Sequence, residues 1–538
     1  MQLIRALQCG TILLTLSHVM ALTAQAPSPS PDTPTIQVNS RLVFLDVTVL
    51  DKKGRPVVSG LTKDDFILTE DKKPQRIFSF EPPESHVVGV DATADNPAGK
   101  APVTIFVLDL LDSRFSDFAY IKYMVRKYLA AQPAQLDSPA EIMVLGNQTL
   151  EMVQGYTRSK ADLLYSLDHL QSVLPYKEIN GAFWAERFGQ TIDALQQIAL
   201  QSRGVAGRKN IVWVGHGGPS IYTVDMPPST VDLLNRYVHD TTNMLVDSRV
   251  SLFLIYPGLS SASVGYSFSE AAAGADIGED DPFAGDINFG VFVNETGGRL
   301  FYNRNDVNAE IKQSEQLGSE YYTLTYQPAA GRADGKFRRI RMALRDPSLR
   351  VMTKAGYFSP EKDGGAGPRQ QRMVNLAEAE RSSLPFNTLD VKIEDLVRHP
   401  DTRTAQFTVV LSSHNLDWLP NEAGKSSVDL LMAAASLSGG REFLASKVEG
   451  FQTSADSQNP AQLAKATTRI PMTLRMPRKT NSLRVVIQLS TNGRTGAAEL
   501  DRKALEAAPE APTPEPKLMP QPIHQPAPPP VPATATRP

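Results

Sequence analysis

Two aspartates and a serine follow a strongly apolar run of the chain. Asp109 comes directly after Val103-Thr-Ile-Phe-Val-Leu108, and Asp112 and Ser113 lie three and four residues further on. Carboxylate and hydroxyl oxygens are the hard ligands that Mg2+ and Ca2+ prefer. If the run is a buried strand of a parallel sheet, its carboxyl end lies where such sheets bind their ligands. These three residues are therefore the first candidates for a divalent-cation site.

A second acidic segment extends from Asp276 to Asp286 and contains Asp280 and Asp281. It could hold Ca2+, but it lacks the spaced Asp and Asn ligands followed by a Glu that form an EF-hand loop. We expect a solvated loop here. Its acidic side chains would then be available to a partner rather than to an ion.

Catalytic motifs are incomplete. Gly215-His-Gly-Gly218 is similar to the oxyanion-hole loop of esterases, yet Gly265-Tyr-Ser-Phe-Ser269 lacks the final glycine of a Gly-x-Ser-x-Gly nucleophile turn. The chain has no His-Glu-x-x-His zinc motif, no phosphate-binding Gly-x-x-x-x-Gly-Lys loop and no Gly-x-Gly-x-x-Gly. We expect no enzyme and no resident cofactor, with weak Mg2+ or Ca2+ binding as the alternative.

Other residues are candidates for a protein interface. Trp184 ends a predicted loop that begins at Pro175, and His216 follows a predicted strand. With Asp280 and Asp281 they would form a partner-binding edge, because loops after parallel strands meet at one edge of the sheet. Trp213 lies inside an apolar strand and is expected in the core.

The elements that must position these residues alternate along the chain. After the run that ends at Leu108, Phe118, Ile121, Val125 and Leu129 recur at helical spacing. We expect further strands at 141–145, 211–214 and 252–256, and helices near 159–170, 186–202 and 229–246. Strands that alternate with helices predict a doubly wound α/β domain with a parallel sheet, over residues 100–319.

Short alternating strands flank this domain on both sides. They predict one β-sandwich built from residues 36–99 and 320–360, with the α/β domain inserted between the two parts. A linker over 361–384 then leads to a second β-sandwich-like domain at 385–500. The fold class is thus α/β plus all-β.

The ends of the chain have a different composition. Residues 1–26 resemble a secretory signal peptide, with Arg5 before a short apolar stretch and small residues near Ala24. We expect export to the periplasm, the outer surface or the medium. Residues 27–35 are predicted to form a Pro-rich linker, and residues 501–538 are predicted to form a disordered Pro-rich tail. The single cysteine, Cys9, lies in the signal, so the mature chain would have no disulfide.

Charge excludes one class of partner. The 538 residues contain 55 Lys and Arg and 58 Asp and Glu, a net charge of −3. This balance provides no overall field that would attract nucleic acid or an anionic membrane. A basic patch could still exist locally. No second apolar span follows the signal, so we expect no transmembrane segment in the mature chain.

Three stretches resemble the von Willebrand factor A-domain-related (VWA-related) proteins of acidobacteria and similar bacteria. They are Val47 to Phe66, Val107 to Ser113, and Glu295 to Arg299 with Tyr321 to Tyr326 and Gly356-Tyr357. The resemblance covers about 36–360. It implies an A-type α/β domain used for adhesion or protein binding, often through a metal-ion-dependent adhesion site, and it names no ligand.

The chain departs from that metal-binding pattern. The family motif Asp-x-Ser-x-Ser would begin at Asp109, but Leu111 occupies the first serine position and only Ser113 fits the second. Thr191 is an out-of-register candidate for the threonine of the second loop. Gly215 and His216 stand where a later aspartate would be. We therefore interpret the site as degenerate and expect Asp109 to order its own loop.

Together these features favour an exported, non-enzymatic protein-binding or adhesion-type protein with a protein partner of unknown identity and an unknown oligomeric state. A structural envelope or assembly subunit is the first alternative, with the Pro-rich tail and the β domains as spacers. A secreted serine-type hydrolase is the second alternative.

Overall fold

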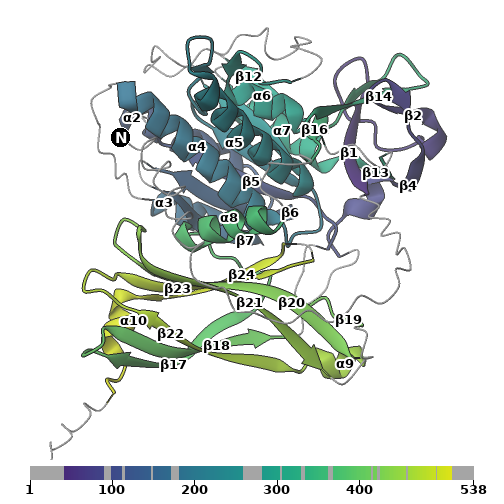
Figure 1. Cartoon of the computed structure of the whole chain (residues 1–538). Coiled ribbons are helices and arrows are strands. Elements are labelled where there is room, and N and C mark those ends of the chain that lie inside the picture. Colours follow the sequence, from purple (N-terminus) through teal and green to yellow (C-terminus); the bar gives the residue numbers. More distant parts are fainter. Residues whose placement is uncertain are drawn as a thin grey trace, which may run out of the picture.

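The computed structural model describes residues 42–89, 99–111, 115–146, 149–170, 181–257, 281–302, 306–328, 334–360, 368–413, 416–420, 425–455, 459–491 and 493–511. Three units share this part of the chain (Figure 1). They are an N-terminal β module, an α/β domain and a C-terminal β region. The expected signal, the linker at 27–35 and residues 512–538 lie outside the described residues.

A six-stranded sheet forms the centre of the α/β domain, in the strand order β12-β10-β8-β5-β6-β7. The strands are β5 (Val103–Asp109), β6 (Gln135–Leu145), β7 (Leu150–Ser159), β8 (Lys209–Val214), β10 (Val250–Tyr256) and β12 (Arg299–Tyr302). Neighbours pair in parallel except β7, which is antiparallel to β6 at the edge. Counted along the domain, this is the order 3-2-1-4-5-6 of doubly wound sheets.

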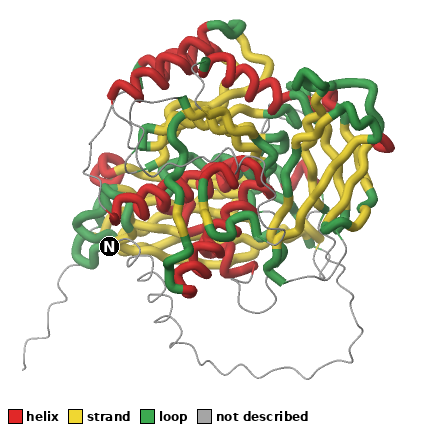
Figure 2. Tube along the Cα trace, turned by 90° about the horizontal axis from the view of Figure 1, so that it is seen from above, coloured by secondary structure: helices red, strands yellow, loops and turns green. Residues whose placement is uncertain are grey.

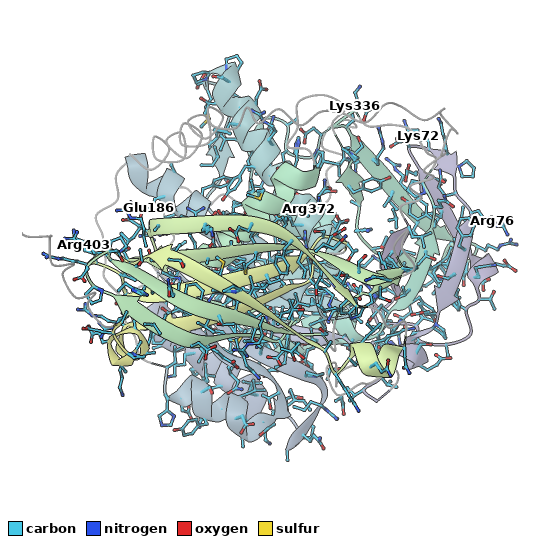
Figure 3. All side chains as sticks on the ribbon, turned by 60° about the horizontal axis from the view of Figure 1, so that its bottom comes forward. Lys72, Arg76, Glu186, Lys336, Arg372 and Arg403 are labelled. Carbon is cyan, nitrogen blue, oxygen red and sulfur yellow. The ribbon has the colours of Figure 1, made fainter. Side chains whose placement is uncertain are left out.

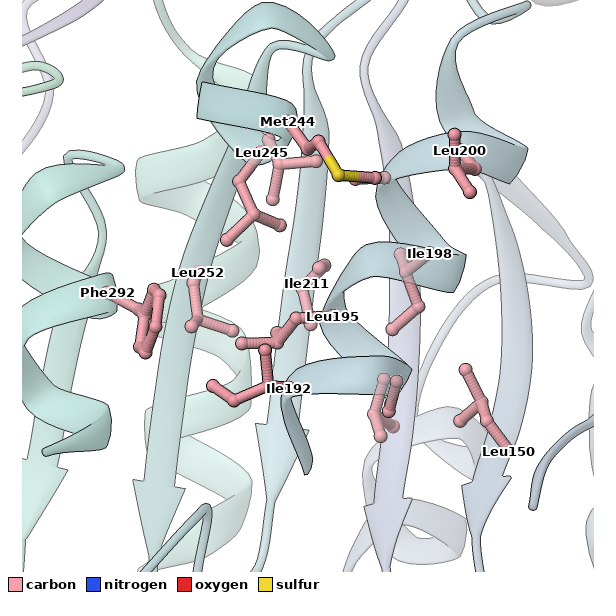
Figure 4. Packing of buried hydrophobic residues seen from close by; sticks show 14 of the residues in the cluster. Leu150, Ile192, Leu195, Ile198, Leu200, Ile211, Met244, Leu245, Leu252 and Phe292 are labelled. Carbon is pink, nitrogen blue, oxygen red and sulfur yellow. The ribbon is translucent and has the colours of Figure 1, made fainter. Parts of the chain in front are cut away.

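Helices cover both faces of this sheet (Figure 2). They are α2 (Phe115–Ala130), α3 (Lys160–Asp168), α4 (Gly181–Ser202), α5 (Pro228–Asp247), α6 (Phe289–Glu295) and α7 (Val307–Ser319). Successive side chains of a strand point to opposite faces. Ile105 and Val107 of β5 accordingly pack with residues of α4, α5 and α6, which Figure 4 shows from close by. Phe106 and Leu108 pack with α2, α3 and α7. The sheet is therefore buried on both faces.

The N-terminal β module is built from two distant parts of the chain. One four-stranded sheet has the order β15-β1-β13-β4 and the other β16-β14-β2-β3. The strands are β1 (Val43–Leu50), β2 (Phe66–Glu70), β3 (Lys73–Pro74), β4 (Ile77–Glu81), β13 (Tyr322–Tyr326), β14 (Phe337–Leu344), β15 (Arg350–Met352) and β16 (Gly356–Phe358), with short 3-10 turns at Lys63–Asp65 and Pro83–His86. Side chains from both sheets form one buried cluster. Pairing of β1 with β13 brings residues 43–47 beside 322–326.

A buried polar joint connects this module to the amino ends of β8 and β10. Arg249 donates to Asp46 of β1 through Nη2 at 2.5 Å and Nε at 3.1 Å. Arg208 donates to Thr48 Oγ1 and Ser251 Oγ, both at 2.9 Å. Burial by itself would raise the pKa of Asp46, but the charge and hydrogen bonds of Arg249 hold it at about 2. The joint therefore places a charged pair inside the contact between the two units.

The Glu295-Thr-Gly-Gly stretch lies in the same contact. A Cβ on Gly298 would fall 1.8 Å from the Leu252 carbonyl oxygen, and one on Gly297 would fall 2.4 Å from the Thr353 carbonyl carbon. The Ala355 N–H donates to the Glu295 carbonyl oxygen at 3.2 Å. Gly297 therefore allows close packing between the domain and the module, and Gly298 allows close packing against β10 within the domain.

The C-terminal β region consists of a three-stranded sheet, β17-β18-β22, and a five-stranded sheet, β19-β20-β23-β24 with β21 on the other side of β20. Its elements are β17 (Val391–His399), β18 (Thr404–Ser412), β19 (Leu419–Pro420), β20 (Ser426–Leu437), β21 (Phe443–Ala455), α9 (Pro460–Leu463), β22 (Thr467–Arg475), β23 (Ser482–Leu489), β24 (Thr495–Asp501) and α10 (Arg502–Ala507). Both sheets contribute to one buried cluster. The opposite face of β20 and β23 is also buried, because Leu431, Ala433 and Val486 belong to the α/β core cluster.

Helix α8 (Pro368–Arg381) lies between this sheet and the α/β domain (Figure 1). Two arginines of the C-terminal region hold its carboxyl end. Arg484 donates to the carbonyl oxygens of Ala379 and Leu384 at 3.0 and 2.6 Å, and Arg441 donates to that of Ser382 at 2.6 Å. Glu499 pairs with both guanidinium groups. Cations near the last carbonyl groups of a helix are stabilising.

Two segments differ from their sequence-based expectation. Residues 361–384 were expected to form a linker, but 368–381 form α8, which is anchored on both sides. The tail was expected from residue 501, yet Asp501 accepts from Ala504 N at 2.8 Å and caps α10. No helix of the described residues is both long and apolar enough to cross a membrane.

Candidate functional site

The candidate site lies where the order of the central sheet reverses. Strands β5 and β8 are neighbours, but the chain continues from β5 towards β6 and from β8 towards β10. At such a switch point the loops that follow the two strands diverge, and ligands bind there in doubly wound proteins. Asp109 ends β5, and Gly215 follows β8. We call this end of the sheet, with the loops that follow its strands, the carboxyl edge.

The Asp109 carboxylate is fully buried and accepts hydrogen bonds from three directions. Its Oδ2 accepts from Trp213 Nε1 at 2.9 Å and from the Gly217 N–H at 2.8 Å. Its Oδ1 accepts from the Leu111 N–H at 3.1 Å. A buried carboxylate requires such donors to replace its lost hydration. Asp109 therefore joins the loops after β5 and β8 at the switch point.

Glycine is required in the loop after β8. Gly215 has a φ of 149°, and a Cβ there would lie 2.4 Å from the Asp109 Cβ. Gly217 has a φ of 72°, in the left-handed region that side chains disfavour. The Gly-His-Gly-Gly sequence thus serves a close backbone approach to Asp109.

Thr191 lies against the other side of this loop. A Cβ on Gly218 would be 3.1 Å from the Thr191 Cγ2 methyl carbon. The Thr191 hydroxyl donates to the Arg187 carbonyl oxygen at 2.9 Å, within helix α4. The structure therefore brings Thr191 to the site with its methyl group against the loop.

His216 was expected on the partner-binding edge, but its side chain is only 1% exposed. Burial lowers its pKa to about 4, against the opposing charge of Asp117 in the first turn of α2. Its ring meets the Tyr256 ring edge-on at 5.6 Å, and Tyr256 stacks on Tyr302 at 5.2 Å. A neutral, buried ring beside aromatic rings supports the loop from inside, so His216 is not available as a surface contact.

The site residues predicted from the sequence did not include Asp117, Tyr256 and Tyr302. Tyr256 and Tyr302 are the last residues of β10 and β12, so the signal that could have found them is a polar aromatic residue at the end of an apolar strand. Asp117 lies in the first turn of α2, eight residues after Asp109 in the sequence. This closeness to Asp109 did not reveal that the charge of Asp117 acts on His216.

Asp281 contacts α5 rather than an ion. Its carboxylate pairs with His239 Nε2 at 2.9 Å and accepts from the Phe283 N–H at 2.9 Å. The His239 ring stacks on Phe358 of β16 at 3.7 Å. Asp281 thus helps to fix the end of its loop against α5 and the β module.

The other predicted site residues are described in part or not at all. Asp112, Ser113 and Asp280 lie outside the described residues. Trp184 lies in the first turn of α4 rather than in a loop, and its side chain is outside the described part. Within the described residues, no group of three or more His, Cys, Asp or Glu side chains is placed to hold a metal ion.

Two exposed apolar side chains mark the surface of the carboxyl edge. Tyr222 is 60% exposed and Val224 is 83% exposed. Both lie in the segment between β8 and α5, where β9 (Ile221–Tyr222) pairs with β11 (Asp286–Ile287) after β10. This pairing fixes the position of the loop after β8 relative to the loop after β10.

Comparison with known proteins gives a limited result. No protein-family model matches the chain, and no curated protein matches it. Among solved structures it is similar to one described as the crystal structure of the SpRpn10 VWA domain, with 18% sequence identity and a TM-score of 0.18. The match covers 30% of this chain and 77% of that one. This likeness is too low to assign site residues or ligands.

Proposed function

We propose that the chain is an exported, non-enzymatic binding protein whose carboxyl edge contacts a protein partner without a bridging metal ion. The observation that carries the proposal is the bonding of Asp109. Both carboxylate oxygens accept hydrogen bonds from the protein itself, from Trp213, Gly217 and Leu111.

A metal ion at Asp109 would compete with these donors. The side chain of Trp213 is fully buried, so its Nε1–H has no access to water as a replacement acceptor. A buried donor that loses its acceptor costs about 1–3 kcal/mol. Thr191, the second candidate ligand, has its Cγ2 methyl carbon against the loop, and its hydroxyl donates to the Arg187 carbonyl oxygen within its own helix. These contacts favour a carboxylate that orders the loop over one that holds an ion.

The partner would contact the surface around Tyr222 and Val224. Exposed aromatic and aliphatic side chains on an ordered loop are typical of protein interfaces. The pairing of β9 with β11 joins the segment that carries Tyr222 to the chain before α6. Trp184 and Asp280 remain proposed contacts on the same edge.

We further propose that the α/β domain is of the VWA type and is inserted into a β-sandwich formed by the two sheets of the N-terminal module. The strand order, the shared core of the two sheets and the three family-like stretches support this assignment. The C-terminal region would form a second sandwich that holds α8.

The proposal is tested by capture of a partner from the native envelope fraction, with and without a chelator. The baits are the mature chain, a Tyr222→Ala and Val224→Asp variant, and a Val448→Asp control on β21, where Val448 is 39% exposed. We expect a partner that the mature chain and the control capture equally, with or without chelator, and that the edge variant loses. Loss on chelation would contradict metal independence, and equal capture by all three baits would contradict the position of the surface.

A further inference from the structure

The nearly neutral net charge of the chain conceals a strong separation between its units. The α/β domain, residues 100–320, has 17 Lys and Arg against 26 Asp and Glu, a net charge of −9. The N-terminal β module, residues 43–86 and 321–358, has 15 against 10, a net charge of +5. The region 386–511 has 15 against 14. Of the three units, the N-terminal β module therefore has the largest net positive charge.

Two turns meet at the outer end of this module. Asp71 and Lys72 form the turn between β2 and β3, with φ values of 49° and 65°. Arg338 lies 3.8 Å from the Asp71 carboxylate and 2.5 Å from that of Asp334, in the approach to β14. The Asp71 carboxylate also accepts from the Arg339 N–H at 3.0 Å. The acidic side chains of both turns are therefore engaged with the module itself.

Basic side chains in these turns and in the segment from β3 to β4 are exposed. Lys72, Lys73, Arg76 and Lys336 are all exposed, and we call these four residues the basic tip. Figure 3 shows Lys72 and Lys336 near one another at the top of the module, and Arg76 farther along its outer side. Beside them, Phe78 is 52% exposed, and the Arg76 guanidinium lies over its ring at 5.5 Å.

We propose that the basic tip docks the protein on an anionic lipid surface. Clustered lysines and arginines are attracted to anionic headgroups, and an exposed aromatic ring can enter the headgroup boundary. Phe78 beneath Arg76 provides both parts at one point. The acidic α/β domain would be repelled by the same surface, so the charge separation also orients the chain, with the tip towards the lipid.

The test is co-sedimentation of the mature full-length chain with vesicles of phosphatidylcholine, with and without one third phosphatidylglycerol. We expect binding only to the anionic vesicles, weakening as salt is raised above about 0.1 M because exposed charges are screened. A Lys72→Ala, Lys73→Ala, Arg76→Ala and Lys336→Ala variant should bind roughly several hundredfold more weakly at low salt, since each of the four basic residues contributes roughly fivefold. Phe78→Ser alone should give a smaller, salt-independent loss.

A matched control removes the same number of exposed basic residues elsewhere, as Arg403→Ala, Lys465→Ala, Arg478→Ala and Lys479→Ala in the C-terminal region. It should bind like the unaltered chain. Lys73 on an edge strand also discourages pairing with other sheets, so both variants are first shown to stay in the supernatant without vesicles. Equal binding of the two variants, or no binding to anionic vesicles at low salt, would overturn the proposal. Binding to soluble polyglutamate but not to vesicles would overturn it in favour of an acidic polymer.

Discussion

The two ends of the central sheet bury charge in different ways. At the amino end, Arg249 and Asp46 form a charged pair between the α/β domain and the β module. At the carboxyl edge, the single carboxylate of Asp109 is held by neutral N–H donors of its own domain. The first arrangement connects two units, and the second orders one loop.

The difference indicates which end is free for a partner. The amino end is closed by Asp46, Thr48 and Thr323 of the module, so its charges are used within the molecule. At the carboxyl edge, Asp109 is buried, whereas Tyr222 and Val224 of the segment after β8 are exposed. A partner there would meet a preformed surface without displacing another unit of the chain.

The largest expected effect is at the amino end. Asp46→Asn leaves Arg249 and Arg208 without their buried carboxylate, which should lower the free energy of unfolding by about 3–5 kcal/mol. Urea denaturation followed by circular dichroism measures this change. Asp168→Asn is the matched control, because its pair with Arg126 is exposed and should contribute less than about 1 kcal/mol. Similar losses in both variants would show that the joint contributes no more than a surface pair.

The next effect concerns the close approach at the switch point. Gly215→Ala would place a methyl group 2.4 Å from the Asp109 Cβ, so we expect a loss of about 2–3 kcal/mol from the clash and the strained backbone. Gly54→Ala serves as control, since its φ is 77° but no atom lies within 4 Å of the added Cβ. Thermal unfolding of both variants gives the comparison. If Gly54→Ala is as destabilising as Gly215→Ala, the backbone conformation alone explains the effect.

Asp109→Asn should have a smaller effect than the loss of Asp46. The amide retains one oxygen acceptor but presents an NH2 group to donors, so we expect a loss of about 1–3 kcal/mol. The indole of Trp213 loses or weakens its bond to residue 109, which should shift its fluorescence. A variant as stable as the unaltered chain, with an unchanged Trp213 signal, would contradict a loop-ordering role for Asp109.

The remaining effects are changes in the dependence of stability on pH. Burial lowers the pKa of His216 from its ordinary 6.5 to about 4 and that of Lys209 from 10.5 to about 7. The unfolded chain then binds more protons than the folded chain between each pair of values. Stability should therefore decrease as pH falls from 6.5 to 4 for His216, and from 10.5 to 7 for Lys209.

Two variants separate these contributions. His216→Gln should flatten the acidic part of the stability profile and Lys209→Met the alkaline part, each without changing the other. Denaturation at a series of pH values provides the measurement. If neither variant alters its own part of the profile, the burial of these two groups does not govern the pH dependence of stability.

Strong periodic segments were predictable from the sequence. The apolar run ending at Leu108 is strand β5, and the helices expected at 186–202 and 229–246 are α4 and α5 with similar bounds. Their signal is local, because a strand buried on both faces must be apolar throughout. The two parts of the β module were expected to pack together because each is too small to form a sufficient core alone, and β1 pairs with β13.

Other features depend on contacts that one segment does not reveal. Strand β7 has a mixed composition because it lies at the edge of the sheet. Helix α8 is positioned by long-range contacts, which include the burial of Leu376 in the core and the bond of Arg484 to the Ala379 carbonyl oxygen. His216 was expected at the binding edge because it follows a predicted strand, yet the glycines beside it let the loop approach Asp109 closely and His216 is buried. The Asp109 bonds to Trp213 and Gly217 span 104 and 108 residues and leave no pattern in the sequence.

Titration calorimetry of the mature chain with Mg2+, Mn2+ and Ca2+, repeated with Asp109→Ala, tests the central claim of a metal-independent carboxyl edge most directly. A bound ion would have to displace the donors that Asp109 already holds. We predict no binding at micromolar concentrations for either protein. Micromolar binding of any of these ions that is abolished in Asp109→Ala would contradict the claim and establish a metal-dependent site.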